Sequence, residues 1–152
     1  MKAEQVTLEP RTFLGLHEVV PMSGLTEYFG RAFQTTAAEL ERLGSHPSGP
    51  PIALYHSTPT DAAVDVTAGF PVAEEVPSTP AVDVVHLPSG PAVETYHSGP
   101  YDTMTETYAA VTDWITENKL TVAGEMWEEY LVGPDTEPDP AGWRTRIVFP
   151  LA

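Results

Sequence analysis

The stretch "PMSGLTEYF", residues 21–29, returns in outline as "PYDTMTETY", residues 100–108, and this recurrence decides the fold. The matched positions are Pro21 with Pro100, Leu25 with Met104, Glu27 with Glu106 and Phe29 with Tyr108. Two further matches follow in the same order, "YHSTP" with "YLVGP" and "GFPV" with "VFPL". Similar segments in the same order indicate two copies of one supersecondary unit.

The first copy reads as strand, helix, strand, strand. Residues 6–20 are rich in β-branched and apolar types, which favour strands, and Pro10 predicts a kink. Residues 23–43 place apolar side chains at helical spacing, and Gly44 stops this helix. Two strand-like runs, 51–57 and 62–72, complete the copy.

The second copy begins after a connector, residues 73–80, which carries charge and two prolines without periodicity. Residues 101–120 are expected to form its helix, with Asp102 or Thr103 as N-cap and a capping box from Thr103 to Glu106. The strands of this copy are expected at 81–87, 91–98, 125–132 and 143–151.

These patterns predict an α+β fold. Tandem duplicated β-α-β-β units would form one antiparallel sheet with both helices on one face and a ligand groove at the pseudo-twofold junction. We expect a single domain over residues 1–152, with internal repeats at 6–72 and 81–151 joined by the connector 73–80.

Charge limits the partners that the chain can have. It carries 22 acidic against 7 basic residues, a net charge of −15, and its basic residues do not cluster. Such a surface repels phosphate backbones and anionic lipids, so we expect no direct nucleic-acid binding and no membrane association. The N-terminus lacks the apolar region of a signal peptide and there is no cysteine, which favours a cytoplasmic protein. The oligomeric state is left open.

The usual signatures of cofactor chemistry are not found in the sequence. It has no Walker loop, dinucleotide fingerprint or nucleophile elbow, so no cofactor is expected. The five histidines show neither His-x-x-x-His nor His-x-Glu spacing, so no metal site is expected either.

The segment "EMWEEYLVGP", residues 125–134, places two adjacent acids between two aromatic side chains. Alternation along a strand puts Glu128 on the same face as Tyr130 and Glu129 on the same face as Trp127. We expect Glu128 to face the helices and Glu129 to face solvent. A carboxylate on a buried aromatic face favours a ligand that brings a compensating cation.

Two motifs of the second copy resemble a known family. A His-x-Gly-Pro-Tyr sequence, residues 97–101, leads into the helix, and a Trp-Glu-x-Tyr-Leu strand, residues 127–131, precedes a Pro- and Asp-rich loop and a terminal Arg-Thr-x-Ile strand. This pattern is similar to the GyrI-like small-molecule-binding family, also known as the effector-binding domain of some AraC-type and MerR-type regulators. The resemblance implies a groove between two tandem units and a functional glutamate for lipophilic cations, at the position of Glu128. Glu129 stands where the family usually has an apolar residue.

The expected function is therefore binding or sequestration of lipophilic, aromatic and cationic small molecules. The candidate ligand-binding residues are Glu128, Tyr130, Tyr55, Trp114 and Tyr108. The resemblance leaves two alternatives open. One is hydrolysis of strained, cyclopropane-bearing electrophiles, for which Glu128 and Tyr130 would be the catalytic residues. The other is a protein interaction like that of gyrase inhibitors.

Overall fold

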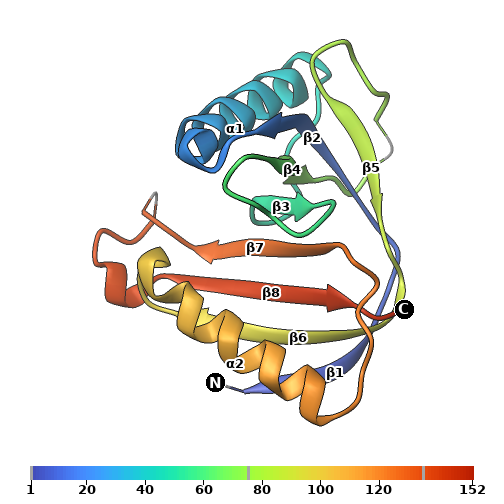
Figure 1. Ribbon diagram of the computed structural model, residues 1–152. Coiled ribbons are helices and arrows are strands. Elements are labelled where there is room, and N and C mark those ends of the chain that lie inside the picture. Colours follow the sequence, from blue (N-terminus) through green and yellow to red (C-terminus); the bar gives the residue numbers. More distant parts are fainter. Residues whose placement is uncertain (1, 75, 135) are drawn as a thin grey trace.

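The computed structural model describes residues 2–74, 76–134 and 136–152, and within them it contains one sheet and two α-helices (Figure 1). The strands are β1 (Ala3–Leu8), β2 (Arg11–Val20), β3 (Ile52–Tyr55), β4 (Val64–Pro71), β5 (Asp83–Leu87), β6 (Gly90–Ser98), β7 (Met126–Val132) and β8 (Arg144–Pro150). The helices are α1 (Leu25–Arg42) and α2 (Met104–Glu117). Neither helix is long and apolar enough, within these residues, to cross a bilayer.

The sheet confirms the predicted α+β fold with two β-α-β-β units. Its strand order is β1-β6-β8-β7-β3-β4-β2-β5, and every neighbouring pair is antiparallel. One unit is β2-α1-β3-β4 and the other is β6-α2-β7-β8. They meet at the central pair β3 and β7, where Ala53 lies opposite Glu128.

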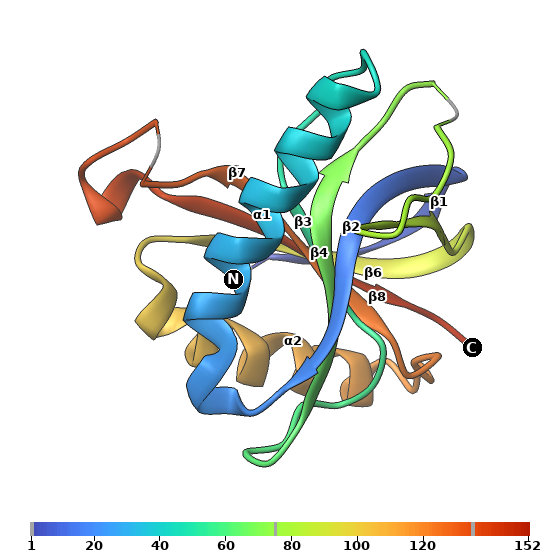
Figure 2. The ribbon, with the colours of Figure 1, turned by 90° about the horizontal axis from the view of Figure 1, so that it is seen from above.

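The outer strands tie the two units together. β1 continues into β2 through a bend at Pro10, and β5 continues into β6 through a bend at Pro88. One register runs through both bends, with Leu8 opposite Gly90 in the β1–β6 pair and Arg11 opposite Leu87 in the β2–β5 pair. β1 thus pairs with β6, and the first half of β2, Arg11–Gly15, pairs with β5, while the sheet as a whole curls into a half-barrel (Figures 1 and 2).

Both helices cover the same face of the sheet, as predicted. α1 packs against β3 and β4 through a cluster that contains Tyr28, Ala32 and Ala68. α2 packs against β6 through Val111 and Val93. Figure 1 shows α1 beside the β2–β4 half and α2 beside the β6–β8 half.

The middle of the opposite face of the sheet is also buried. Its side chains come from β2, β3, β5, β6, β7 and β8, around which the sheet curls, and the largest of them is Trp127. The cluster consists of Phe13, Ile52, Leu54, Leu87, Ala92, Trp127 and Val148. The inside of the curl is therefore a second core, separate from the one under the helices.

The predicted helix starts need correction. Each α-helix is preceded by one turn of 3-10 helix, at Met22–Gly24 and Tyr101–Thr103. Thr103 is the N-cap of α2, one of the two residues predicted, but the predicted capping box is wrong, because the Thr103 side chain makes no capping bond. Its hydroxyl group donates instead to the Pro100 carbonyl oxygen at 2.9 Å and lies 3.2 Å from His97 Nε2.

Candidate functional site

The Glu128 carboxyl group lies under the helices, in the middle of the sheet. Tyr130, two residues along β7, donates a hydrogen bond to Glu128 Oε1 at 2.6 Å. Tyr108 on α2 donates to Glu128 Oε2. Tyr55 at the end of β3 interacts with both Glu128 and Tyr130. The small side chain of Ala53, opposite Glu128 on β3, leaves room for this convergence.

Four of the five predicted ligand-binding side chains are thus brought together. Glu128 is only 7% exposed and lies on the helix-covered face, where alternation along β7 predicts it. Trp114 is the exception. It packs against the cluster of Val93, Val111 and Ile115 further along α2.

The surroundings of Glu128 favour its neutral form. Burial raises the pKa of Glu128, and the hydrogen bonds from Tyr108, Tyr130 and Tyr55 and the nearby His97 offset this only in part. No ion pair to Glu128 is found among the described residues. A buried carboxyl group without a cation either holds a proton or accepts a positively charged partner.

The three tyrosines keep their protons. Burial and the adjacent carboxyl group raise the pKa of Tyr108 and Tyr130 well above the usual range, and the same causes act on the pKa of Tyr55. At neutral pH they are hydrogen-bond donors toward Glu128 and carry no charge. The site therefore offers one acid surrounded by neutral phenols.

A group of aromatic rings surrounds Tyr130, and most of these rings were missed at the sequence level. The Tyr130 ring lies edge-on to Phe29 at 6.3 Å, to Phe33 at 6.2 Å and to Tyr101 at 5.9 Å between ring centroids. Phe70 on β4 and Trp143 before β8 extend the group through Phe33 and Tyr101. One signal existed, since the repeat aligns Phe29 with Tyr108.

His97 of the His-x-Gly-Pro-Tyr motif fixes the start of α2. It is 5% exposed, with Nδ1 2.7 Å from Thr107 Oγ1 and Nε2 2.9 Å from the Pro100 carbonyl oxygen. These bonds hold the turn that carries Tyr101 toward Tyr130. The motif thus positions one ring of the aromatic group.

The expectation that Glu129 faces solvent is wrong. Glu129 is 4% exposed and lies on the inside of the curl, where Arg11 donates to its Oε1 at 3.0 Å. Arg146 and Trp127 donate to Oε2 at 2.5 and 3.1 Å. Burial by itself would raise the pKa of Glu129, but Arg11 and Arg146 outweigh it and lower that pKa below its ordinary value. The error arose because a curled sheet has no solvated second face at this position.

Other features of the surface lie away from Glu128. A hollow of about 530 Å³ is lined by Arg11, Ser48, His86 and neighbours, and one of about 310 Å³ by Lys2, Glu94, Arg144 and neighbours. Among the described residues, one group has donor atoms placed for a metal ion: His17, His56 and Asp65. It lies on the opposite face of the sheet from Glu128.

Solved structures share this architecture. The chain aligns over 99% of its length with the C-terminal domain of EcmrR, of which it covers 97%, at TM-score 0.79 and 20% identity. It spans 57% of the EcmrR chain in the cryo-EM structure of the EcmrR–DNA complex, at TM-score 0.79 and 21% identity. A hydrolase encoded by lin2189 from Listeria innocua aligns with this chain at TM-score 0.73 and 17% identity. The alignment covers 99% of this chain and 92% of the hydrolase chain.

Another similar structure is SAV2435 bound to tetraphenylphosphonium, at TM-score 0.72 and 13% identity, with 100% of this chain and 94% of that chain covered. A comparison with curated proteins found no match. At the level of sequence families, the model of the GyrI-like small molecule binding domain matches residues 1–152, the whole chain. The chain therefore belongs to the GyrI-like family of small-molecule-binding domains.

Proposed function

We propose that the chain binds lipophilic aromatic cations, with Glu128 as the acid that neutralises them. One observation carries the proposal. Glu128 is a buried carboxyl group with hydroxyl donors on both oxygens and, among the described residues, no ion-pair partner. A ligand cation would provide the missing positive charge and displace the proton that burial favours.

The aromatic rings suit the rest of such a ligand. Rings from α1, β4, the turn before α2 and the β7–β8 loop form the aromatic group around Tyr130, and each ring face that meets a cation contributes about 0.5–2 kcal/mol. Delocalised or shielded cations lose little hydration energy on burial, whereas a compact ammonium loses much. The preferred ligand is therefore a cation whose charge is spread over or enclosed by aromatic groups.

Access to Glu128 requires a side chain to move. Glu128 is 7% exposed, with Tyr108 and Tyr130 on its carboxyl oxygens, while Tyr101 is 38% exposed. Side-chain rotation of this kind is common on ligand binding and needs no backbone change. A ligand would enter between α1 and α2 by displacing Tyr101 or Tyr130 from the aromatic group.

Calorimetric titration with tetraphenylphosphonium tests the proposal, because a protein of the same fold has been solved with this cation. Triphenylphosphine oxide is the neutral control. We expect saturable binding of the cation, at least tenfold tighter than the neutral compound and only modestly weaker at 0.5 M salt. Salt screens exposed charges beyond about 10 Å at 0.1 M but affects a buried pair little. Binding that disappears at 0.5 M salt, or equal binding of both compounds, would contradict the proposal.

A second candidate function follows from the same acid. A carboxyl group whose pKa is raised can act as a general acid, and Tyr130 Oη lies 2.6 Å from it. We therefore include hydrolysis of strained electrophiles at Glu128 as the alternative. Incubation with a cyclopropane-bearing electrophile, followed by mass spectrometry, decides between them. A product one water heavier that disappears in Glu128→Gln supports hydrolysis, and recovery of unchanged compound supports binding alone.

A further inference from the structure

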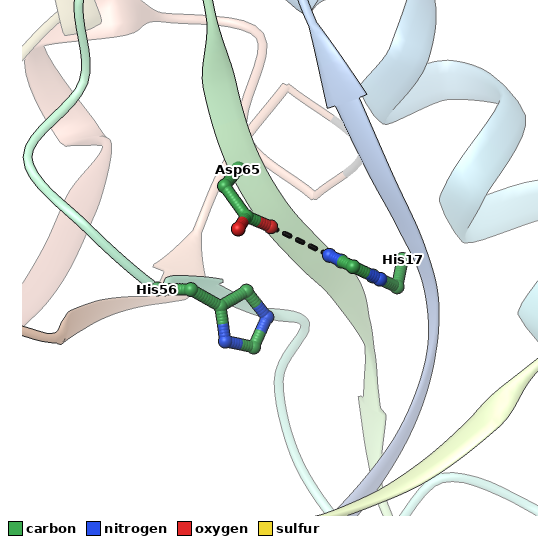
Figure 3. A group of neighbouring side chains, drawn as sticks. All are labelled: His17, His56 and Asp65. Carbon is green, nitrogen blue, oxygen red and sulfur yellow. Dashed lines mark hydrogen bonds and ion pairs between the residues drawn. The ribbon is translucent and has the colours of Figure 1, made fainter.

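Three side chains, two from strands and one from the residue after a third strand, meet on the face of the sheet that the helices do not cover. His17 comes from β2, Asp65 from β4, and His56 follows the last residue of β3. His17 Nε2 lies 2.5 Å from Asp65 Oδ1, and the rings of His17 and His56 are edge-to-face with centroids 5.1 Å apart (Figure 3). Their donor atoms all lie within 4.8 Å of one another.

Strand pairing explains why these residues converge. His17 is paired with Thr67 across β2 and β4, and Leu54 is paired with Thr67 across β3 and β4. Alternation then places Asp65, two residues before Thr67, and His56, two residues after Leu54, on the same face. The backbone N–H of His56 donates to the Asp65 carbonyl oxygen at 3.0 Å, which holds the end of β3 against β4 at this point.

We propose that His17, His56 and Asp65 form a binding site for a divalent transition-metal ion of the zinc class. Two imidazoles and one carboxylate are a common zinc-binding set, with remaining positions filled by water. Bonds of about 2.0–2.2 Å to one ion place the ligand atoms about 3.3–3.5 Å apart. His17 Nε2 and Asp65 Oδ1, which lie 2.5 Å apart, must therefore separate by roughly 1 Å, while donor atoms that lie up to 4.8 Å apart must approach by about as much. These shifts need only side-chain rotation, because His17 and Asp65 are 44% and 37% exposed.

The surroundings favour a cation at this place. The His56 ring is held by Thr67, whose Oγ1 lies 2.7 Å from His56 Nε2. A hydrogen bond that orients a ligand imidazole is typical of the outer shell of metal sites. No lysine or arginine is ion-paired to Asp65 among the described residues, and the chain as a whole carries a net charge of −15. An incoming ion would replace the His17–Asp65 hydrogen bond with bonds to all three side chains.

The site is independent of Glu128. Asp65 and Thr67 alternate along β4 with Val64, Val66 and Ala68, which pack against α1 on the face that holds Glu128. The sheet itself thus separates the two places. The two proposals can therefore succeed or fail separately.

The test uses the full chain without an affinity tag, treated with a chelator and then titrated with zinc chloride by calorimetry. Variants His17→Gln, His56→Gln and Asp65→Asn remove one ligand each. His46→Gln is the matched control, because His46 is exposed in the loop after α1. Titration with cobalt chloride adds a spectroscopic measurement, since the visible absorption of the bound ion reports its coordination geometry.

We expect one zinc ion per chain, and each ligand variant should bind it at least tenfold more weakly. This scale is conservative, because loss of even an outer-shell partner changes metal affinity by about 10–100-fold. His46→Gln should bind zinc like the original chain, and the cobalt spectrum should show low-symmetry coordination that the ligand variants lose. Thermal unfolding of each variant confirms that the fold is kept. Weak, unsaturable binding, or the same affinity in all variants, would overturn the proposal.

Discussion

Glu128 and Glu129 are adjacent in the chain and both are less than a tenth exposed, yet their surroundings are opposite. Glu129 lies inside the curl between two arginines, which lower its pKa. Glu128 lies under the helices among tyrosines, and burial raises its pKa. The same residue type at the same depth is thus a satisfied ion pair on one face of a strand and an uncompensated acid on the other.

The difference shows which of the two acids stabilises the fold and which is available to a ligand. A buried charge whose partners are in place becomes costly when one partner is removed. A buried acid without a cation is costly as it stands, and a ligand can relieve that cost. We therefore expect Glu129 variants to affect stability and Glu128 variants to affect binding.

The largest effect is expected for Glu129→Gln. It leaves Arg146, which is 18% exposed, without one of its two carboxylate partners, and removes the charge that faces Arg11. Removing one partner of a buried ion pair lowers the free energy of unfolding by about 3–5 kcal/mol. Because Arg11 is partly exposed, we expect a loss of about 3 kcal/mol. Urea unfolding measures the loss, with Glu106→Gln on the exposed side of α2 as control. A loss below about 1 kcal/mol would show that the arginines find other partners.

Glu128→Gln should have the next largest effect, and on a different property. Tetraphenylphosphonium binding should weaken by about 1–3 kcal/mol, the scale for removing one charge of a partly buried pair. The free energy of unfolding should stay the same or rise, because the amide is cheaper to bury than the carboxylate. If Glu128→Gln instead destabilises the fold as much as Glu129→Gln, the proposed contrast between the two acids is wrong.

The pH dependence of stability should differ in sign between the two acids. The pKa of Glu128 is raised above its ordinary value of 4.5. Its contribution to the free energy of unfolding is therefore present at lower pH and is lost as the pH rises through the raised pKa. The pKa of Glu129 is lowered, so its contribution is present above 4.5 and is lost as the pH falls through the lowered pKa.

Each unit of difference in pKa corresponds to about 1.4 kcal/mol. The measurement is the unfolding free energy of the original chain minus that of each Gln variant, followed from acid to neutral pH. This difference should fall with pH for Glu128 and rise with pH for Glu129. If both differences changed with pH in the same direction, one of the two environments would be misassigned.

The smallest effect is expected for Tyr130→Phe. It removes a hydrogen bond that lowers the pKa of Glu128, so that pKa should rise further and less of the acid should be charged. One lost hydrogen bond to a charged group should weaken tetraphenylphosphonium binding by about 1–2 kcal/mol at most. Tyr96→Phe, at an exposed tyrosine, serves as the control. An unchanged affinity would place the ligand away from this hydroxyl group.

Local patterns predicted much of the molecule. The repeat from Pro21 to Pro100 predicted the order of elements, and alternation along residues 125–132 predicted that Glu128 and Glu129 point to opposite faces. Thr103 was correctly predicted as an N-cap candidate of α2, but its capping box was wrong, because the Thr103 hydroxyl group bonds to Pro100 and to His97, which lies on the preceding strand. Such competition between local partners is not visible in a capping pattern.

What sequence reasoning missed depends on contacts between distant segments. Arg11 and Glu129 are 118 positions apart, and they meet only because β2 and β7 curl around the same core. The rings around Tyr130 come from four elements, and His17, His56 and Asp65 come from adjacent strands with no common motif. No spacing rule within a single element reports such an arrangement.

The exchange of outer strands has a consequence for how the units hold together. β1 precedes the first unit but pairs with β6 of the second, and β5 precedes the second unit but pairs with β2 of the first. The chain thus resembles a strand-swapped dimer whose two subunits have been joined covalently. If either half, residues 1–74 or 81–152, were produced by itself, its leading strand would have no partner, so we expect it to assemble as a swapped homodimer or to aggregate through that free edge.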